Sequence, residues 1–165
     1  MKGIVAYDSV HGSTRRVAEA MAEQIRSEGH EAQLVFVREW AKGPLEGDFL
    51  FIGSPTRGGR MTKEAKEFIE ALDVAYWKGR RIVTFDTLGP LSKDPEKRRK
   101  ALEGIGDSAK SAGPRMRDAL ERRGLQVAGI WHFAVVGMWG PEAPDAPELA
   151  KGKARSFLAE MASVP

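Results

Sequence analysis

The sequence predicts a doubly wound α/β protein, with five parallel strands in the order 2-1-3-4-5 and helices on both faces of the sheet. Segments typical of strands alternate with segments of helical periodicity along all 165 residues. Several of the strands are apolar at every position, as expected of parallel strands that are covered on both faces. For one domain of this length, the order 2-1-3-4-5 is the natural arrangement. We found no internal repeat and no linker, so we expect a single domain over residues 1–165.

The first strand and helix are predicted within residues 2–29. Four apolar or aromatic residues, Ile4 to Tyr7, form the strand and lead into a loop that is rich in hydroxyl groups. Val17, Met21 and Ile25 then recur one turn apart on one face of a helix, and Gly29 is its expected C-terminal cap. Unpaired backbone N–H groups and the helix dipole point into such a loop, which suits it to an anion such as phosphate.

This first loop has two interpretations. It consists of Ser9, Val10, His11, Gly12, Ser13 and Thr14. It either cradles a phosphate group, or it is an ordinary turn in which Ser13 or Thr14 caps the helix. It is not a Walker loop, because the Gly-Lys-Ser/Thr ending is absent, and it has one glycine where the Rossmann fingerprint has three.

The other elements follow in the same alternation. Strands are predicted at residues 32–37, 48–53, 81–86 and 125–136. Apolar residues at helical spacing predict helices at about 65–72, at about 116–124 and from Asp145 onward. Glu148, three residues after Asp145, completes a capping-box pattern at the start of the last helix.

Two stretches interrupt the alternation. An insertion at about 88–113 follows the fourth strand and contains a charged helical piece at 95–103. It forms a lid, a docking surface or a solvated decoration. The second stretch, 137–144, holds Trp139, which either covers a ligand or packs on the surface; we favour surface packing. His132 lies within the apolar fifth strand, where a hydrogen-bonded core histidine is expected.

Composition limits the chemistry of the chain. Cysteine is absent, which excludes disulfides, thiolate catalysis and cysteine-bound metals, and three scattered histidines make no metal site. No apolar run approaches the roughly 20 residues of a membrane span, and the initial strand leaves no place for a signal peptide, so we expect a cytoplasmic protein. The absence of asparagine and the abundance of arginine suit a thermophile, although a GC-rich genome would produce a similar bias.

The net charge of +3 comes from basic residues that are spread along the chain. Clusters lie at 15–16, 80–81, 97–100 and 122–123. They are not interleaved with aromatic residues, as nucleic-acid binding would require. We therefore interpret them as solvated helix faces and expect no nucleic-acid partner.

Two further loops are expected to lie beside the first one. In a doubly wound sheet, ligands bind at the carboxyl ends of the strands next to the switch point, here after strands one, three and four. The loop after strand three contains Pro55, Thr56, Arg57, Gly58 and Gly59, whose glycines permit close approach to a flat ring. The loop after strand four contributes Thr87, Leu88 and Gly89.

The loops after strands one and three resemble those of the flavodoxin-like FMN-binding proteins. Residues 9–14 are similar to their phosphate loop, and Gly-Ser-Pro-Thr at 53–56 is the usual start of their second loop. Pro-Thr-Arg at 55–57, with Gly-Arg-Met at 59–61, is similar more specifically to the tryptophan-repressor-binding-protein family of FMN-dependent NAD(P)H:quinone oxidoreductases. The resemblance implies that residues 9–14 bind the FMN phosphate and that residues 55–59 and 87–89 contact the flavin.

The resemblance also implies the reaction, while leaving alternatives open. Electrons would come from NAD(P)H or a reductase and pass to a quinone or a redox protein, and the family suggests a homo-oligomer. The chain departs from the family in its basic charge, in its short loop after strand four, and in offering Arg57 and Leu88 where carriers have two aromatic residues. It is an enzyme or a carrier, or alternatively a flavodoxin-fold interaction module without flavin. A response-regulator receiver is excluded, because strand three ends without an acidic residue.

Overall fold

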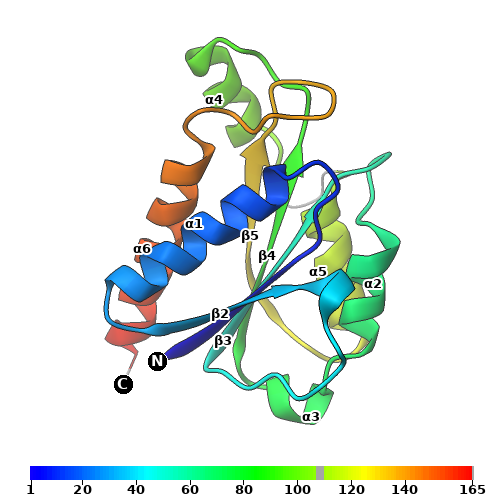
Figure 1. The fold of residues 1–165 in the computed structure, drawn as a ribbon, viewed down its shortest axis with the longest axis vertical. Coiled ribbons are helices and arrows are strands. Elements are labelled where there is room, and N and C mark those ends of the chain that lie inside the picture. Colours follow the sequence, from blue (N-terminus) through cyan, green and yellow to red (C-terminus); the bar gives the residue numbers. More distant parts are fainter. Residues whose placement is uncertain (107–109, 165) are drawn as a thin grey trace.

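The computed structural model describes residues 1–106 and 110–164 and confirms the predicted sheet (Figure 1). Five parallel strands are arranged in the order β2-β1-β3-β4-β5. The strands are β1 (Lys2–Tyr7), β2 (Glu31–Phe36), β3 (Phe49–Pro55), β4 (Arg81–Leu88) and β5 (Val127–Ala134). The chain adds β2 on one side of β1 and then adds β3 on the other side, so the switch point lies between β1 and β3. The loops that follow these two strands meet at the carboxyl edge of the sheet.

Helices cover both faces of the sheet. The long ones are α1 (Ser13–Ser27), α2 (Lys63–Glu70), α4 (Pro95–Glu103), α5 (Ala112–Arg122) and α6 (Ala146–Ser163). Two short turns are the 3₁₀ helix η1 (Val37–Glu39) and α3 (Val74–Trp77). Figure 1 shows α1 and α6 together on one face of the sheet and α2 and α5 on the other.

The core consists of two apolar layers, one on each side of the sheet. Successive residues of a strand point to opposite faces. In β1, Val5 therefore joins the layer under α1 and α6, and Ile4 joins the layer under α2 and α5. This burial on both sides is the reason that the strands are apolar throughout.

Glycines end two of the helices as predicted. Gly29 has φ 85° and its N–H donates to the Arg26 carbonyl at 3.0 Å, so it closes α1 just after the last helical turn. Gly124 closes α5 in the same way with φ 83°. Both glycines adopt the left-handed conformation that L residues avoid.

The structure corrects two predicted boundaries. Strand β5 is shorter than 125–136, because the Leu125 N–H donates to Leu120 at the end of α5 and the Val136 N–H turns toward Pro141. Asp145 precedes α6, but its side chain makes no capping hydrogen bond, so the capping-box prediction is wrong. Its carboxylate instead accepts a hydrogen bond from buried Arg98 of α4 at 3.2 Å.

The insertion at 88–113 contains α4 at the predicted residues 95–103, while its residues 107–109 lie outside the described part of the chain. His132 is hydrogen-bonded, as predicted, but is only partly buried. Its Nδ1 lies 2.7 Å from buried Asp86, and its Nε2 lies 3.1 Å from the Gly106 carbonyl oxygen. In the described residues no helix is long and apolar enough to cross a membrane.

Candidate functional site

A pocket opens at the carboxyl end of the sheet. In Figure 1 the strands β4 and β5 point toward this end, which is the upper end of the molecule. The loops that follow β1, β3 and β4 all contribute to it, as expected of a ligand site beside the switch point. Every predicted site residue except Gly12 and Gly59 lines this pocket. A fourth loop, which follows β5, adds Val135, Gly137, Met138, Trp139 and Gly140.

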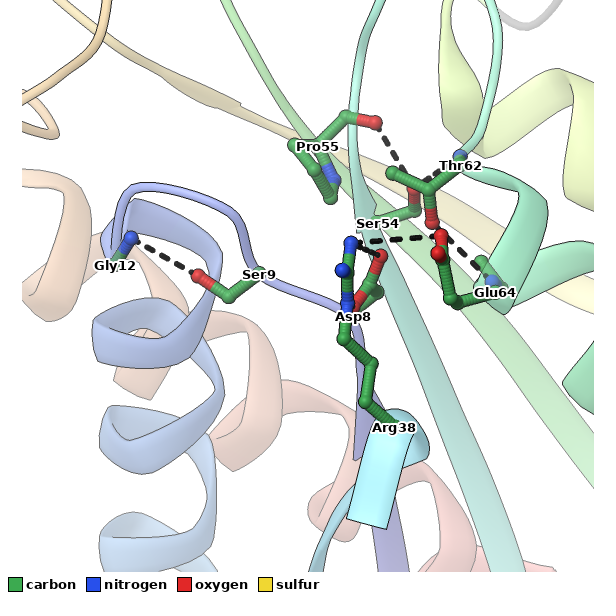
Figure 2. Close-up of polar contacts among 9 residues, drawn as sticks. Asp8, Ser9, Gly12, Arg38, Ser54, Pro55, Thr62 and Glu64 are labelled. Carbon is green, nitrogen blue, oxygen red and sulfur yellow. Dashed lines mark hydrogen bonds and ion pairs between the residues drawn. The ribbon is translucent and has the colours of Figure 1, made fainter. Parts of the chain in front are cut away.

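The loop after β1 presents an uncapped helix end to the pocket. Gly12 is the N-cap residue of α1 and has φ 95°, a left-handed conformation. No side chain caps α1, and Ser13 and Thr14 are its first residues, so the interpretation of either residue as an N-cap is wrong. Ser9 Oγ accepts a hydrogen bond from the Gly12 N–H at 3.1 Å and shapes the turn (Figure 2). The first N–H groups of α1 are thereby left available to an anion.

A buried hydroxyl group lies at the same helix end without a partner. Ser13 Oγ is inaccessible to solvent and has no hydrogen-bond partner within residues 1–106 and 110–164. Gly140 lies opposite, and a Cβ added there would come within 2.9 Å of this hydroxyl oxygen. Buried polar groups are nearly always hydrogen-bonded, so an unpaired one in a pocket points to a ligand that completes it.

Hydroxyl and backbone groups tie three of the loops together. Thr14 Oγ1 and Thr87 Oγ1 are 2.8 Å apart and join the loops after β1 and β4. The Thr56 N–H donates to the Thr87 carbonyl at 2.8 Å, which joins the loops after β3 and β4. Thr56 Oγ1 accepts from the Ala112 N–H at 3.1 Å, at the start of α5. The hydroxyls of these three threonines thus position the loops around the pocket.

The loop after β3 ends in a tight turn. Arg57 and Arg60 exchange backbone hydrogen bonds of 2.9 and 3.1 Å, and Gly58 and Gly59 between them both have positive φ. Ser54 supports the loop from below, because its Oγ donates to the Pro55 carbonyl and accepts from the Thr62 N–H (Figure 2). The exposed Arg57 and Gly58 therefore form a turn held by its own backbone.

Trp139 lies at the mouth of the pocket, between two of the predicted loops. Its ring centroid is 5.0 Å from that of His11, and the Arg57 guanidinium carbon lies 5.9 Å from the Trp139 ring. The Trp139 side chain is 59% exposed. Sequence reasoning favoured surface packing for this residue. Its place in the loop after β5 could have predicted that it lies near the pocket, because the loops that follow parallel strands all lie at one edge of the sheet.

The electrostatics of the pocket favour an anion. Among the described residues that line it there is one arginine, Arg57, and no Asp or Glu. The fully buried Asp8 at the end of β1 is neutralised by Arg38, whose Nε and Nη2 donate to it at 2.7 and 3.1 Å (Figure 2). These hydrogen bonds from Arg38 to Asp8 raise the pKa of the guanidinium further above its usual value. Glu64 also contacts Arg38, at 3.4 Å.

The donor set fits the phosphate of a flavin nucleotide. Uncapped N–H groups, an unpaired serine hydroxyl and two more hydroxyls converge at one end of the pocket. Ser, Thr and backbone N–H groups are the donors that hold phosphate without a metal ion. In the described residues no group of three His, Asp or Glu side chains could hold a metal.

The fold and this pocket define a class of nucleotide-binding α/β proteins, and comparison with known sequences identifies the family. A family model described as "Flavodoxin domain" matches residues 4–136. The chain therefore belongs to the flavodoxin-domain family, as predicted. Membership implies a flavin cofactor and a redox function.

Solved structures share the fold. An archaeal flavodoxin superposes with a TM-score of 0.70 at 18% identity, over 97% of this chain and 98% of its own. Flavodoxin 2 of Bacillus cereus gives 0.68 at 21% identity, over 97% and 99%. The rubredoxin oxygen:oxidoreductase of Desulfovibrio gigas gives 0.65 at 18% identity, over 98% of this chain and 37% of that protein.

Two sequence relatives match parts of the chain. A flavodoxin of Aquifex aeolicus is 41% identical over 71 residues, which are 42% of this chain and 38% of that protein. An uncharacterized protein of Methanocaldococcus jannaschii is 24% identical over 110 residues, 64% of this chain and 28% of its own length. The chain thus spans less than two fifths of the length of either relative.

Proposed function

We propose that this protein binds FMN and transfers electrons from NAD(P)H or a reductase to a quinone or a redox-protein acceptor. The observation that carries the proposal is the buried, unpaired Ser13 hydroxyl at the uncapped start of α1. A phosphate group that accepts from this hydroxyl and from the adjacent N–H groups removes the cost of leaving them unpaired. A flavin with a terminal phosphate is the family cofactor that meets this requirement.

The phosphate end of FMN would be held by residues of the loop after β1. Ser9, Ser13 and Thr14 supply hydroxyls, and Ser13 and Thr14, the first residues of uncapped α1, also supply backbone N–H groups. The dipole of α1, a helix of 15 residues, adds a favourable potential for a dianion at its N-terminus. Gly140 leaves room beside the Ser13 hydroxyl that a larger residue would fill.

The ring end would lie between the loops after β3, β4 and β5. The Arg57–Gly58 turn and Leu88–Gly89 line one part of the pocket, and Trp139 lines its mouth. FMN supplies the redox chemistry when bound, because its ring accepts and releases electrons reversibly. Trp139 offers a flat aromatic surface, which the loops after β3 and β4, with Arg57 and Leu88, lack.

The chain itself has little acid–base chemistry to offer at this site. Apart from Arg57, His11 is the one titratable side chain among the described residues that line the pocket. We infer that the residues of the pocket bind the cofactor, orient it and set its electrostatic surroundings.

A fluorescence titration tests the proposal. FMN added to the cofactor-free protein should lose its fluorescence with saturable, one-to-one binding, whereas riboflavin, which lacks the phosphate, should bind far more weakly. Equal affinity for the two flavins would place the phosphate outside the pocket. Unquenched fluorescence for both would contradict flavin binding and favour the alternative of an interaction module.

A second assay identifies the electron donor. The FMN-loaded protein is mixed with NADH and a benzoquinone, and the near-ultraviolet absorbance band of NADH is followed. Loss of this band without an added reductase would make the protein an NADH:quinone oxidoreductase. A stable band that disappears only after addition of a flavodoxin reductase would make it a carrier.

A further inference from the structure

A basic groove lies next to the flavin pocket, between the start of α2 and the helix α5. Its lining includes five cations, Arg60, Lys63, Lys66, Arg115 and Arg122, and a single carboxylate, Asp118. These lining residues carry a net charge of +4, whereas the whole chain carries +3. The rest of the molecule is therefore net negative by one charge, and this groove is where the basic character of the chain is concentrated.

Most of the groove cations have no carboxylate of their own. In the described part of the chain, Arg60, Lys66, Arg115 and Arg122 form no salt bridge, and all four are exposed. The Asp118 carboxylate is hydrogen-bonded to its neighbour Arg117 at 3.1 Å. These charges face solvent unneutralised, and their summed positive potential attracts a negatively charged partner.

The groove and the flavin pocket share one turn of the chain. Arg57 lines the pocket and Arg60 lines the groove, and their backbones are hydrogen-bonded to each other. A partner that rests on α2 and α5 therefore reaches the turn that borders the ring end of the pocket. Figure 1 shows these two helices on the same face, with the loop after β3 above them.

The form of the groove suits a protein surface rather than a small anion. Its unpaired cations come from the loop after β3 and from two helices, and all of them are exposed, so no desolvated site for a single phosphate is built. No aromatic side chain lines it among the described residues, and base stacking is thereby unavailable to a nucleic acid. Cations spread over two helices match an extended acidic face.

We propose that this groove, defined by Arg60, Lys63, Lys66, Arg115 and Arg122, is the docking surface for a small redox protein with an acidic face. The proposal rests on the proposed function and names the class of partner for the same flavin site. Each oxidised one-electron partner takes one electron, so two of them reoxidise one reduced flavin. The hydrogens of the flavin leave to water as protons, and no further reactant is needed.

Stopped-flow kinetics with two probes of opposite charge test the proposal. The FMN-loaded protein is reduced with dithionite and mixed with an oxidised acidic rubredoxin or with oxidised basic cytochrome c. At about 10 mM ionic strength, where the Debye length is about 30 Å, reduction of rubredoxin should be fast and should slow as salt is added. Reduction of cytochrome c should show a much weaker or opposite salt dependence. Rubredoxin kinetics that do not respond to salt would overturn the proposal.

Charge reversal identifies the face that is used. The variant Lys66→Glu/Arg115→Glu should slow rubredoxin reduction by about tenfold or more at low salt, within the range of electrostatic steering. It should approach the unmodified protein at about 1 M salt, where the Debye length is about 3 Å. The matched control is Lys153→Glu/Arg155→Glu on α6, which makes the same change of net charge with two exposed residues on the opposite face. Equal effects of the two variants would contradict docking in the groove.

A measurement without flavin separates this proposal from the function on which it rests. Rubredoxin is titrated into the ¹⁵N-labelled, cofactor-free chain, and the amide shifts are followed by NMR. Shifts confined to α2, the start of α5 and the turn at 57–60 support docking even if FMN fails to bind. If FMN binds but the shifts lie elsewhere or are absent, the flavin function stands and the docking surface is wrong.

Discussion

The change Ser13→Ala separates the contribution of the phosphate loop to stability from its contribution to binding. Ser13 Oγ is buried and unpaired, and an unsatisfied buried hydroxyl costs about 1–3 kcal/mol. The change removes only one oxygen atom, so it leaves very little empty space behind. The cofactor-free protein should therefore become more stable by about 1 kcal/mol. FMN should instead bind more weakly, because a hydrogen bond to a charged group contributes about 1.5–3 kcal/mol, or about 10- to 150-fold in Kd.

Two measurements check these opposite signs. Urea denaturation of the cofactor-free protein gives the free energy of unfolding, and fluorescence titration gives Kd for FMN and for riboflavin. The matched control is Ser111→Ala, because Ser111 Oγ is the other buried hydroxyl without a partner in the described residues and does not line the pocket. It should raise stability in the same way and leave Kd for FMN unchanged.

Several results would refute the reasoning. A fall in unfolding free energy for Ser13→Ala would mean that the hydroxyl is hydrogen-bonded in the cofactor-free protein. A Kd for FMN within about twofold of the unmodified protein would exclude a hydrogen bond from this hydroxyl to the phosphate. An equal loss of affinity for riboflavin would place the hydroxyl near another part of the flavin.

Three further predictions concern the surroundings of the pocket. Arg38→Met leaves the buried Asp8 carboxylate unpaired and should lower the free energy of unfolding by about 2–3 kcal/mol in urea, with recovery in Arg38→Met/Asp8→Asn; an unchanged midpoint would contradict this. Trp139→Ala should change the free energy of unfolding by less than about 0.5 kcal/mol, because the residue is mostly exposed. It should weaken FMN binding by about 3- to 10-fold and remove most of the quenching of tryptophan fluorescence by FMN. Unaltered quenching would place the flavin ring away from Trp139. Burial raises the pKa of Tyr7 above its ordinary 10.0, so its stabilising contribution is complete below pH 10.0 and is lost as the pH rises through the higher pKa of the folded state. Above pH 10.0, the free energy of unfolding should fall more steeply with pH in the unmodified protein than in Tyr7→Phe. The same pH dependence in both proteins would contradict a raised pKa for Tyr7.

Local sequence patterns were sufficient for most of the architecture. The apolar runs that become β1, β3 and β4 and the helical spacing in α1 and α5 depend on neighbouring residues, so they can be read from the sequence. The loop after β1 was also found in this way, because hydroxyls and a glycine between a strand and a helix form a local motif. Its companion after β3 was found from its glycines and from family resemblance.

The incorrect predictions concern contacts between distant segments. Asp145 has the local pattern of a helix cap, yet its carboxylate is bonded to Arg98, 47 residues away. Trp139 is exposed, as expected, but its contacts with His11 and Arg57 were not predicted, since nothing near it in the sequence indicates either residue. The basic groove was missed for the same reason, because cations of α2 and α5 appear scattered until the two helices pack side by side.

By itself, the sequence determined the class of the fold, the order of its elements and the position of the loop predicted to bind phosphate. These depend on periodicity and on motifs of a few residues. Only the tertiary structure decided that Ser13 is buried without a partner among the described residues, that Trp139 lines the pocket beside His11, and that Arg60 and Arg115 share a groove. Burial and charge pairing are properties of the surroundings of a side chain, and those surroundings come from parts of the chain far apart in sequence.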